Sequence, residues 1–216
     1  MPDRLKSVLA KLGPFIGLLL VITVFAIPSE SREYFLTYHN FKIILIQTVI
    51  VAVGALGMTM IIVSGGIDLS VGSTIAFTSV VGALLIQQGW NDLAVVAAIL
   101  FSGAFIGLLN GAAISGLRMT PFIITLGSLG AVRGSAKWLA DNQTVNYERD
   151  VSAIDTWMTT EDPFSYALPA GVWITLGLAV LTAVMLRKTV FGRHIFALGS
   201  NEATARLCGV PTRRLK

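Results

Sequence analysis

Six long apolar stretches divide the chain, and short polar segments separate them. A helix that crosses the hydrocarbon core of a bilayer needs about 20 mostly apolar residues, and each stretch is close to that length. The pattern therefore predicts membrane-spanning helices near residues 12–28, 41–63, 69–87, 93–116, 121–140 and 168–186. We expect an all-α polytopic bundle of about six spans.

A polar interruption separates the second and third apolar stretches. Residues 64–73 read Ser-Gly-Gly-Ile-Asp-Leu-Ser-Val-Gly-Ser, and a charge at the middle of a bilayer costs about 2.5–3.5 kcal/mol. In a structural interpretation, Asp68 caps a helix that restarts at Leu69, with help from Ser70. In a functional interpretation, Gly65, Gly66, Asp68 and Ser70 form a gate or helix break in a solute pathway. We favour the structural role for Asp68.

Small residues recur along the fourth stretch at one helical spacing. Gly103, Gly107, Gly111 and Ser115 lie four residues apart and form one smooth helix face, which lets a neighbouring backbone approach closely. Asn110 lies beside this face and is a further candidate for the pathway. Helix packing is the simpler interpretation of the small residues, and lining of a solute path is the alternative.

Composition places the chain in the membrane. Hydrophobic residues make up 54% of it, charged residues 13%, and the mean hydropathy is +0.76, whereas soluble domains carry about 25% charged residues. The first apolar stretch follows three basic residues, as in a signal peptide. Residues 28–31 lack a convincing cleavage site, so we interpret this stretch as an uncleaved first helix.

Basic residues are distributed unequally between the two sides of the predicted bundle. With the N-terminus in the cytoplasm, eleven basic residues lie on the cytoplasmic side and three on the other, at Arg32, Lys42 and Arg149. This positive-inside bias predicts that both termini are cytoplasmic. The cytoplasmic set is Arg4, Lys6, Lys11, Arg118, Arg187, Lys188, Arg193, Arg206, Arg213, Arg214 and Lys216.

The sequence carries no pattern typical of a membrane enzyme. It has no phosphate-binding loop with Gly-Lys-Ser or Gly-Lys-Thr, so any ATP would be hydrolysed by a separate chain. The two histidines, His39 and His194, fall on opposite predicted sides and offer no metal pair. We therefore expect no catalytic residues, no cofactor, no metal and no nucleic-acid partner.

Three stretches of the sequence resemble one family. They are residues 64–73; then Asn110-Gly111 with residues 120–127 and Arg133-Gly134; and finally residues 191–210. These blocks resemble the ribose/xylose-type permease subunits of bacterial ABC importers, in the branched-chain amino acid/sugar permease superfamily. The third block departs from the family at Thr204 and Cys208, where alanine and serine are more usual.

The resemblance implies a transport function and a set of partner proteins. Such permeases pair as homo- or heterodimers in the bacterial inner membrane, which they cross several times. They receive a monosaccharide or similar small polar solute from a periplasmic sugar-binding protein. A cytoplasmic ABC ATPase then drives the solute inward. The resemblance implies a transporter subunit rather than an enzyme.

The third block lies in a predicted cytoplasmic segment, residues 187–216, which follows a permease domain of residues 1–186. Ser200 can cap a two-turn helix, Glu202 suits its positive end, and Gly209 with Pro211 can end it. The resemblance implies that this helix docks on the ATPase. The alternative is a basic segment that lies on anionic lipid. The residues implied in coupling are Asn201, Glu202, Ala203, Ala205, Leu207 and Gly209.

Family members are usually longer and carry further spans after the cytoplasmic segment. We therefore expect this sequence to be the N-terminal part of a permease, as a truncated gene product, a fragment, or one half of a split permease. The alternative function is a non-transporting membrane remnant or scaffold that keeps the docking segment.

Overall fold

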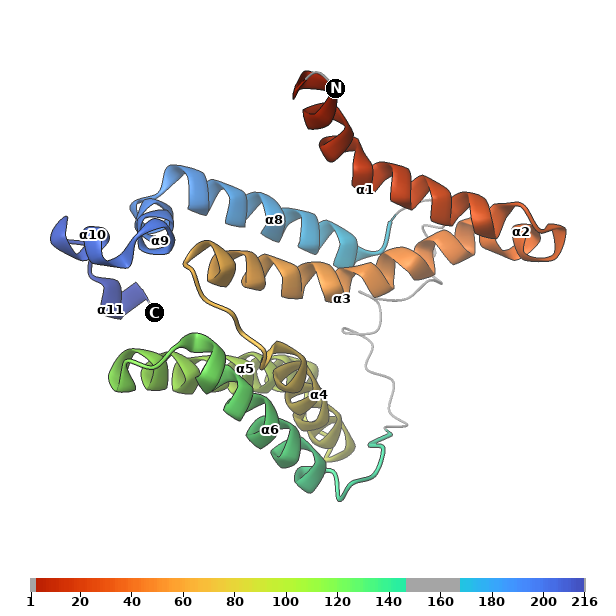
Figure 1. The fold of residues 1–216 in the computed structure, drawn as a ribbon. Helices are drawn as coiled ribbons and strands as arrows, with labels where there is room; N and C mark the ends of the chain where they lie inside the picture. Colours follow the sequence, from red (N-terminus) through yellow and green to blue (C-terminus); the bar gives the residue numbers. More distant parts are fainter. Residues whose placement is uncertain (1–2, 147–167, 216) are drawn as a thin grey trace.

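The computed structural model describes residues 3–146 and 168–215, and this part of the chain folds into helices without a strand (Figure 1). The longer helices are α1 (Asp3–Ala26), α3 (Tyr38–Val63), α4 (Val71–Gln87), α5 (Asp92–Leu117), α6 (Pro121–Leu139) and α8 (Ala170–Lys188). The shorter ones are α2 (Ser29–Phe35), α9 (Val190–Ser200), α10 (Glu202–Leu207) and α11 (Thr212–Leu215).

The all-helical prediction is confirmed, and each predicted span overlaps one of the six longer helices. Three of them, α3, α5 and α8, are long and apolar enough to cross a membrane, with mean hydropathies of 2.2, 2.2 and 1.8. Shorter apolar helical segments cover Leu12–Ala26 and Val71–Gln87. The structure therefore supports a protein that crosses the membrane more than once.

Polar residues at the expected places begin several helices. The Asn91 side chain accepts a hydrogen bond from the Ala94 backbone N–H at 2.7 Å and so caps α5. The Thr37 hydroxyl accepts from the Asn40 N–H at 3.2 Å and caps α3. Pro121 occupies the first turn of α6, where its missing N–H costs nothing. These caps satisfy donors that the helix itself leaves without partners.

The helices pack in two groups. In one, α4 packs against both α5 and α6; in the other, α3 packs against α8 and α9 (Figure 1). The helix α1 packs against α2 and points away from both groups in Figure 1. The connection from Ser64 to Ser70 runs from the end of α3 in one group to the start of α4 in the other.

The small core of the first group lies between α4 and α5. Val95 is fully buried there, beside Ile86, and Ile99 packs against both. A Cβ atom on Gly82 would lie 2.7 Å from the Ile99 Cδ1 atom, so this glycine allows the two helices to approach closely. Close helix contact in a membrane protein depends on such small residues because lipid offers no hydrophobic drive for association.

The smooth face of α5 has a mixed role. A Cβ atom on Gly103 would lie 3.6 Å from the Thr78 Cγ2 atom of α4, which is ordinary packing distance. A Cβ on Gly107 would meet no atom within 4 Å among the described residues. Within the described chain, Gly103 therefore packs against α4, whereas Gly107 contacts no neighbouring helix and its packing role stays a prediction.

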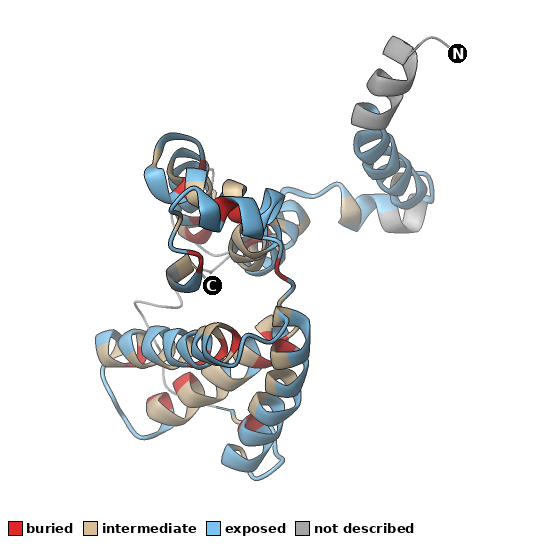
Figure 2. Ribbon diagram, turned by 60° about the vertical axis from the view of Figure 1, so that its left-hand side comes forward, coloured by how far each residue is buried: buried red, intermediate tan, exposed pale blue. Residues whose placement is uncertain are grey.

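Large apolar side chains cover the outside of both groups, and most of the ribbon in Figure 2 is exposed. Leu93 is 81% exposed, Phe101 73% and Val180 64%. Helices satisfy their backbone hydrogen bonds internally, so their apolar faces can contact hydrocarbon without cost. This surface suits a bilayer rather than water.

Candidate functional site

The candidate site begins where α3 ends. Gly65 has a φ of +82°, which glycine adopts without strain. The Gly65 N–H donates to the Ile62 carbonyl at 3.0 Å, and the Gly66 N–H donates to the Ile61 carbonyl at 2.9 Å. This is the Schellman pattern, which ends a helix and satisfies its last carbonyls. The glycine pair therefore stops α3 and turns the chain toward α4.

Asp68 and Ser70 form a tight polar turn before α4. The Asp68 Oδ1 atom accepts from the Ser70 backbone N–H at 2.7 Å and from the Ser70 hydroxyl at 2.6 Å. The helix itself begins at Val71, with Ser70 at the capping position and no side-chain cap. The prediction that the helix restarts at Leu69 is therefore wrong by two residues, because the carboxylate closes a turn ahead of the helix.

Asn110 of α5 fastens this turn to the neighbouring helix. Its Nδ2 atom donates to the Ser70 hydroxyl oxygen at 2.9 Å. Ser70 is 1% exposed and Asn110 is 8% exposed, so this chain of hydrogen bonds runs through the interior. Hydrogen bonds in a low-dielectric interior are strong, and a lost partner there is costly. The structure thus unites three candidate residues that are up to 42 positions apart.

Thr125 of α6 adds a second attachment. Its hydroxyl lies 3.2 Å from the Ile67 carbonyl oxygen and 2.9 Å from the Pro121 carbonyl oxygen, and the side chain is 2% exposed. Thr125 is not among the site residues predicted from the sequence. A threonine in an apolar helix, shortly after a proline, was the available signal, but its partner 58 positions away was not visible in the sequence.

A cavity of about 730 Å³ lies beside this network and between the two helix groups. Asp68 and Asn110 line it from the α4–α6 side, and Ile195 and Leu198 line it from α9. Asn201 and Glu202 line it as well, so the polar break and the predicted coupling segment share one cavity. Leu207 and Ala203 lie outside its lining.

The helix α9 packs directly on the break. Ile195 and Leu198 are each 3% exposed on its inner side. A Cβ atom on Gly199 would overlap the Val63 carbonyl oxygen, and a Cβ on Gly65 would lie 3.5 Å from the Gly199 Cα atom. The backbones of α9 and of the break are therefore in contact. This contact of Gly199 was not predicted from the sequence, since a glycine in a sequence does not indicate which residue it contacts.

The predicted coupling helix exists, but its cap differs from the prediction. Ser200 is the last residue of α9, and the Asn201 side chain accepts from the Thr204 N–H at 3.0 Å to cap α10. Ser200 cannot cap α10 because the preceding helix includes it. Gly209, with a φ of +81°, follows the end of α10.

The side chains of α10 divide into an inner and an outer set. Ala205 is 4% exposed, whereas Leu207 is 89% exposed and Ala203 is also exposed. Glu202 occupies the first turn, where a carboxylate suits the helix dipole. Cys208 caps the end of the helix and is exposed. The side chain of Leu207 is therefore exposed on the outer side of α10.

Residues 40–216 match the protein family described as "Branched-chain amino acid transport system / permease component". This match covers most of the chain, including the break, the α5 and α6 residues bound to it, and α10. The chain belongs to this permease family.

Several curated permeases are similar to this family member. The ribose import permease protein RbsC of Escherichia coli strain K12 is 37% identical over 202 residues, which cover 93% of this chain and 62% of the relative. RbsC of Bacillus subtilis strain 168 is 34% identical over 97% of this chain and 63% of the relative. The autoinducer 2 import system permease protein LsrC of Salmonella paratyphi B is 28% identical, over 93% and 56%.

This permease-family chain thus spans less than two thirds of the length of these relatives. No solved structure matches it. The matched region begins at residue 40, just after the start of α3, so every helix of the candidate site falls within it.

Proposed function

We propose that this chain is the N-terminal part of a permease subunit in an ATP-driven importer of a monosaccharide or similar small polar solute. Family membership and the ribose and autoinducer 2 relatives support the class of solute. The structural observation that carries the proposal is the buried Asp68–Ser70–Asn110 network beside a cavity between two apolar helix groups. Polar groups inside a membrane bundle are costly and usually mark a solute path.

The proposal assigns two tasks to the site. Gly65, Gly66, Asp68, Ser70 and Asn110 shape the pathway at its break. The residues of α10 and its caps (Asn201, Glu202, Ala203, Ala205, Leu207 and Gly209) couple the permease to a cytoplasmic ABC ATPase. The exposed Leu207 supports docking, since a short helix with an apolar anchor suits a groove on a partner.

The remaining partners follow from the same proposal. The chain lies in the bacterial inner membrane with both termini in the cytoplasm, and it pairs with a second permease chain. A periplasmic sugar-binding protein delivers the solute to the outer side. The segment between the predicted spans 121–140 and 168–186 would face the outer side, and its residues 147–167 lie outside the described residues.

A transport assay tests the proposal. The chain is reconstituted in vesicles with the ATPase, the sugar-binding protein and any further permease chain that are encoded beside it. We expect ATP-dependent uptake of radiolabelled ribose or a competing monosaccharide. Asp68→Ala removes both hydrogen bonds that the carboxylate accepts from Ser70, so uptake should fall by at least about tenfold. Asp92→Ala, at the first turn of α5, is the matched control and should keep near-normal uptake.

The alternative function gives a different outcome in the same assay. A scaffold or remnant would bind the ATPase and yet show no ATP-dependent uptake of any tested solute, with or without Asp68. Uptake that is equally sensitive to both aspartate variants would contradict the role of the break.

A further inference from the structure

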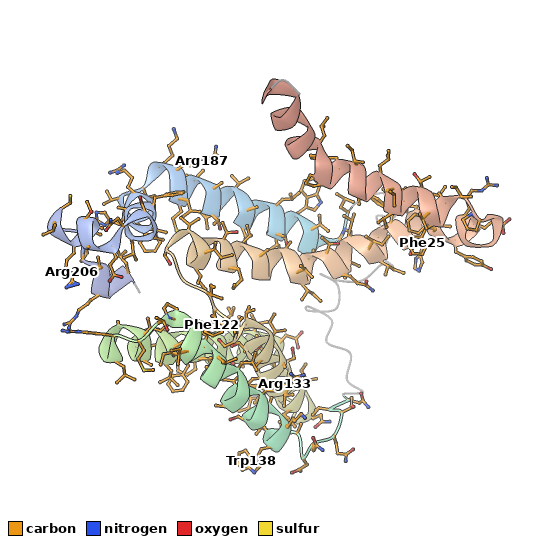
Figure 3. All side chains as sticks on the ribbon, viewed as in Figure 1. Phe25, Phe122, Arg133, Trp138, Arg187 and Arg206 are labelled. Atoms are coloured by element: carbon orange, nitrogen blue, oxygen red, sulfur yellow. The ribbon has the colours of Figure 1, made fainter. Side chains whose placement is uncertain are left out.

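A second cavity, of about 620 Å³, lies between the end of α5 and the α10–α11 segment. Three arginines from three separate elements line it: Arg118 at the end of α5, Arg206 in α10 and Arg213 in α11. Figure 3 shows Arg206 at the end of the molecule formed by α9–α11, with Arg187 on the other side of that end. The convergence is a product of the fold, because Arg118 and Arg206 are 88 positions apart.

The charges around this cavity are unbalanced. Glu202 is the one carboxylate among its lining residues, against three guanidinium groups. In the part of the chain that the structure describes, none of the three arginines forms an ion pair or a side-chain hydrogen bond. Arg118 and Arg206 are both exposed. Like charges repel one another when they are brought together, so the arrangement favours a bound anion.

The chemistry of the lining suits a phosphate group. A guanidinium group presents a planar set of donors that fits phosphate oxygens in a bidentate manner. Apolar residues complete the lining, at Ile114, Val210 and Pro211. Leu117, which precedes Arg118 at the end of α5, is 66% exposed. An anion with an apolar body attached would therefore contact both kinds of surface.

We propose that this cavity, the arginine pocket, binds the headgroup phosphate of an anionic phospholipid in the cytoplasmic leaflet. In the topology proposed above, this cavity lies on the cytoplasmic side of the membrane. Basic pockets on that side suit anionic lipid headgroups such as that of cardiolipin. A soluble phosphate would use the arginines alone, whereas a lipid would also use the apolar rim and the exposed Leu117. A bound lipid would join the end of α5 to α10 through one shared ligand.

Native mass spectrometry of the chain released from lipid nanodiscs tests the arginine pocket. Nanodiscs contain phosphatidylcholine with either phosphatidylglycerol or cardiolipin. We expect retained anionic lipid on the unaltered chain and about a hundredfold weaker binding in the Arg118→Gln/Arg206→Gln/Arg213→Gln variant, because each surface cation contributes roughly fivefold. The matched control, Arg187→Gln/Lys188→Gln/Arg193→Gln, removes the same charge outside the pocket and should retain the lipid.

Two further measurements distinguish lipid phosphate from soluble phosphate and control for misfolded protein. An Arg→Lys version of the pocket variant keeps the charge and should retain more lipid than the Gln version. Equal lipid loss in the pocket and control variants, or retention by both, would overturn the proposal. It would also be overturned if inorganic phosphate bound to the pocket while neither anionic lipid did, because the site would then serve a soluble anion.

Discussion

At the scale of single residues, Ser70 is the centre of the polar break. Its hydroxyl donates to Asp68 and accepts from Asn110, so one side chain links the α3–α4 connection to α5. Removal of this hydroxyl would leave the buried Asn110 amide without its Ser70 partner, while Asp68 would keep the hydrogen bond from the Ser70 backbone N–H. An unsatisfied buried polar group costs about 1–3 kcal/mol, which is large against the marginal stability of folded proteins.

Ser70→Ala should therefore lower the stability of the chain by about 1–3 kcal/mol. Ser102→Ala is the control, because the Ser102 hydroxyl bonds only to the Ile99 carbonyl in its own helix, and it should change stability by less than about 0.5 kcal/mol. Thermal unfolding in nanodiscs, followed by size-exclusion chromatography, measures both. Equal midpoints for the two variants would contradict the central role of Ser70.

Gly199 is a second residue with a strict requirement. Because a Cβ atom there would overlap the Val63 carbonyl oxygen, which belongs to the backbone, a side chain cannot be accommodated by a rotamer change. Overpacking of this kind typically costs about 1–3 kcal/mol. The helix α9 would have to move away from the break.

Gly199→Ala should consequently destabilise the chain and reduce coupled transport more than it reduces ATPase binding. Gly130→Ala is the matched control, since a Cβ there meets no described atom within 4 Å and alanine favours a helix by up to about 1 kcal/mol over glycine. Thermal unfolding, ATPase co-purification and uptake are measured together. Normal stability of Gly199→Ala would show that α9 and the break are not in firm contact.

At the scale of elements, α10 is a short helix that depends on its N-terminal cap for stability. Six residues are too few to be stable alone, so the Asn201 cap and the buried Ala205 must hold the helix in place. The exposed Leu207 contributes nothing to that stability within the described chain. Its exposure is therefore available for a partner.

Glu202→Arg combined with Leu207→Asp should abolish co-purification of the ATPase while leaving the chain folded. The charge at the first turn is reversed and the apolar anchor is removed, so a docking interface would lose its central contact. Glu33→Arg with Leu36→Asp makes the same changes in and after α2, at the other end of the molecule in Figure 1. Unchanged co-purification in the α10 variant would show that the ATPase docks elsewhere.

The six longer helices and α10 could be predicted from the sequence, but α2, α9 and α11 were not predicted, and neither were the helix ends and contacts. Apolar length identified all six long helices because twenty apolar residues in a bilayer have few other options. The start of α4 and the cap of α10 were displaced by one or two residues, since Asp68, Ser70, Ser200 and Asn201 are all suitable capping residues. The tertiary geometry chose among them.

Some residues of the candidate site could also be predicted from the sequence, and others could not. Gly65, Gly66 and Asp68 were recognisable because they interrupt an apolar run. Thr125 and Gly199 were missed because their importance depends on backbone atoms distant in sequence, at Ile67 and Val63. A short-range pattern contains no information about such partners.

At the scale of the whole molecule, the two helix groups flank a cavity lined by both polar and apolar residues, and they expose apolar faces outward. Gly107 lines the cavity, whereas Phe101 on the same helix is 73% exposed outside its lining. If the outer faces contact lipid and the cavity holds water, the two positions differ in access to a charged reagent. Hydrocarbon does not solvate charge.

In a Cys208→Ser background, Gly107→Cys in nanodiscs should react with a charged methanethiosulfonate reagent at least about tenfold faster than Phe101→Cys, since the lipid face excludes ions. A Cβ at Gly107 meets no described atom within 4 Å, so the substitution leaves the packing undisturbed. Reaction rates are measured by mass spectrometry, with unfolded protein as the control for intrinsic reactivity. Equal rates in the folded protein would mean that the cavity is not a water-filled space.

The α3–α4 connection is attached at two points, and these attachments restrict how the two helix groups can move relative to each other. Gly65 lies against Gly199 on one side, and the Ile67 carbonyl is held by Thr125 on the other, so Gly66 alone separates the two anchor points. A residue spans at most about 3.6 Å of extended chain, which leaves almost no slack. While both contacts are intact, the two helix groups cannot separate at this connection. We therefore expect any relative motion of the two helix groups at this connection to be a rotation about Gly66.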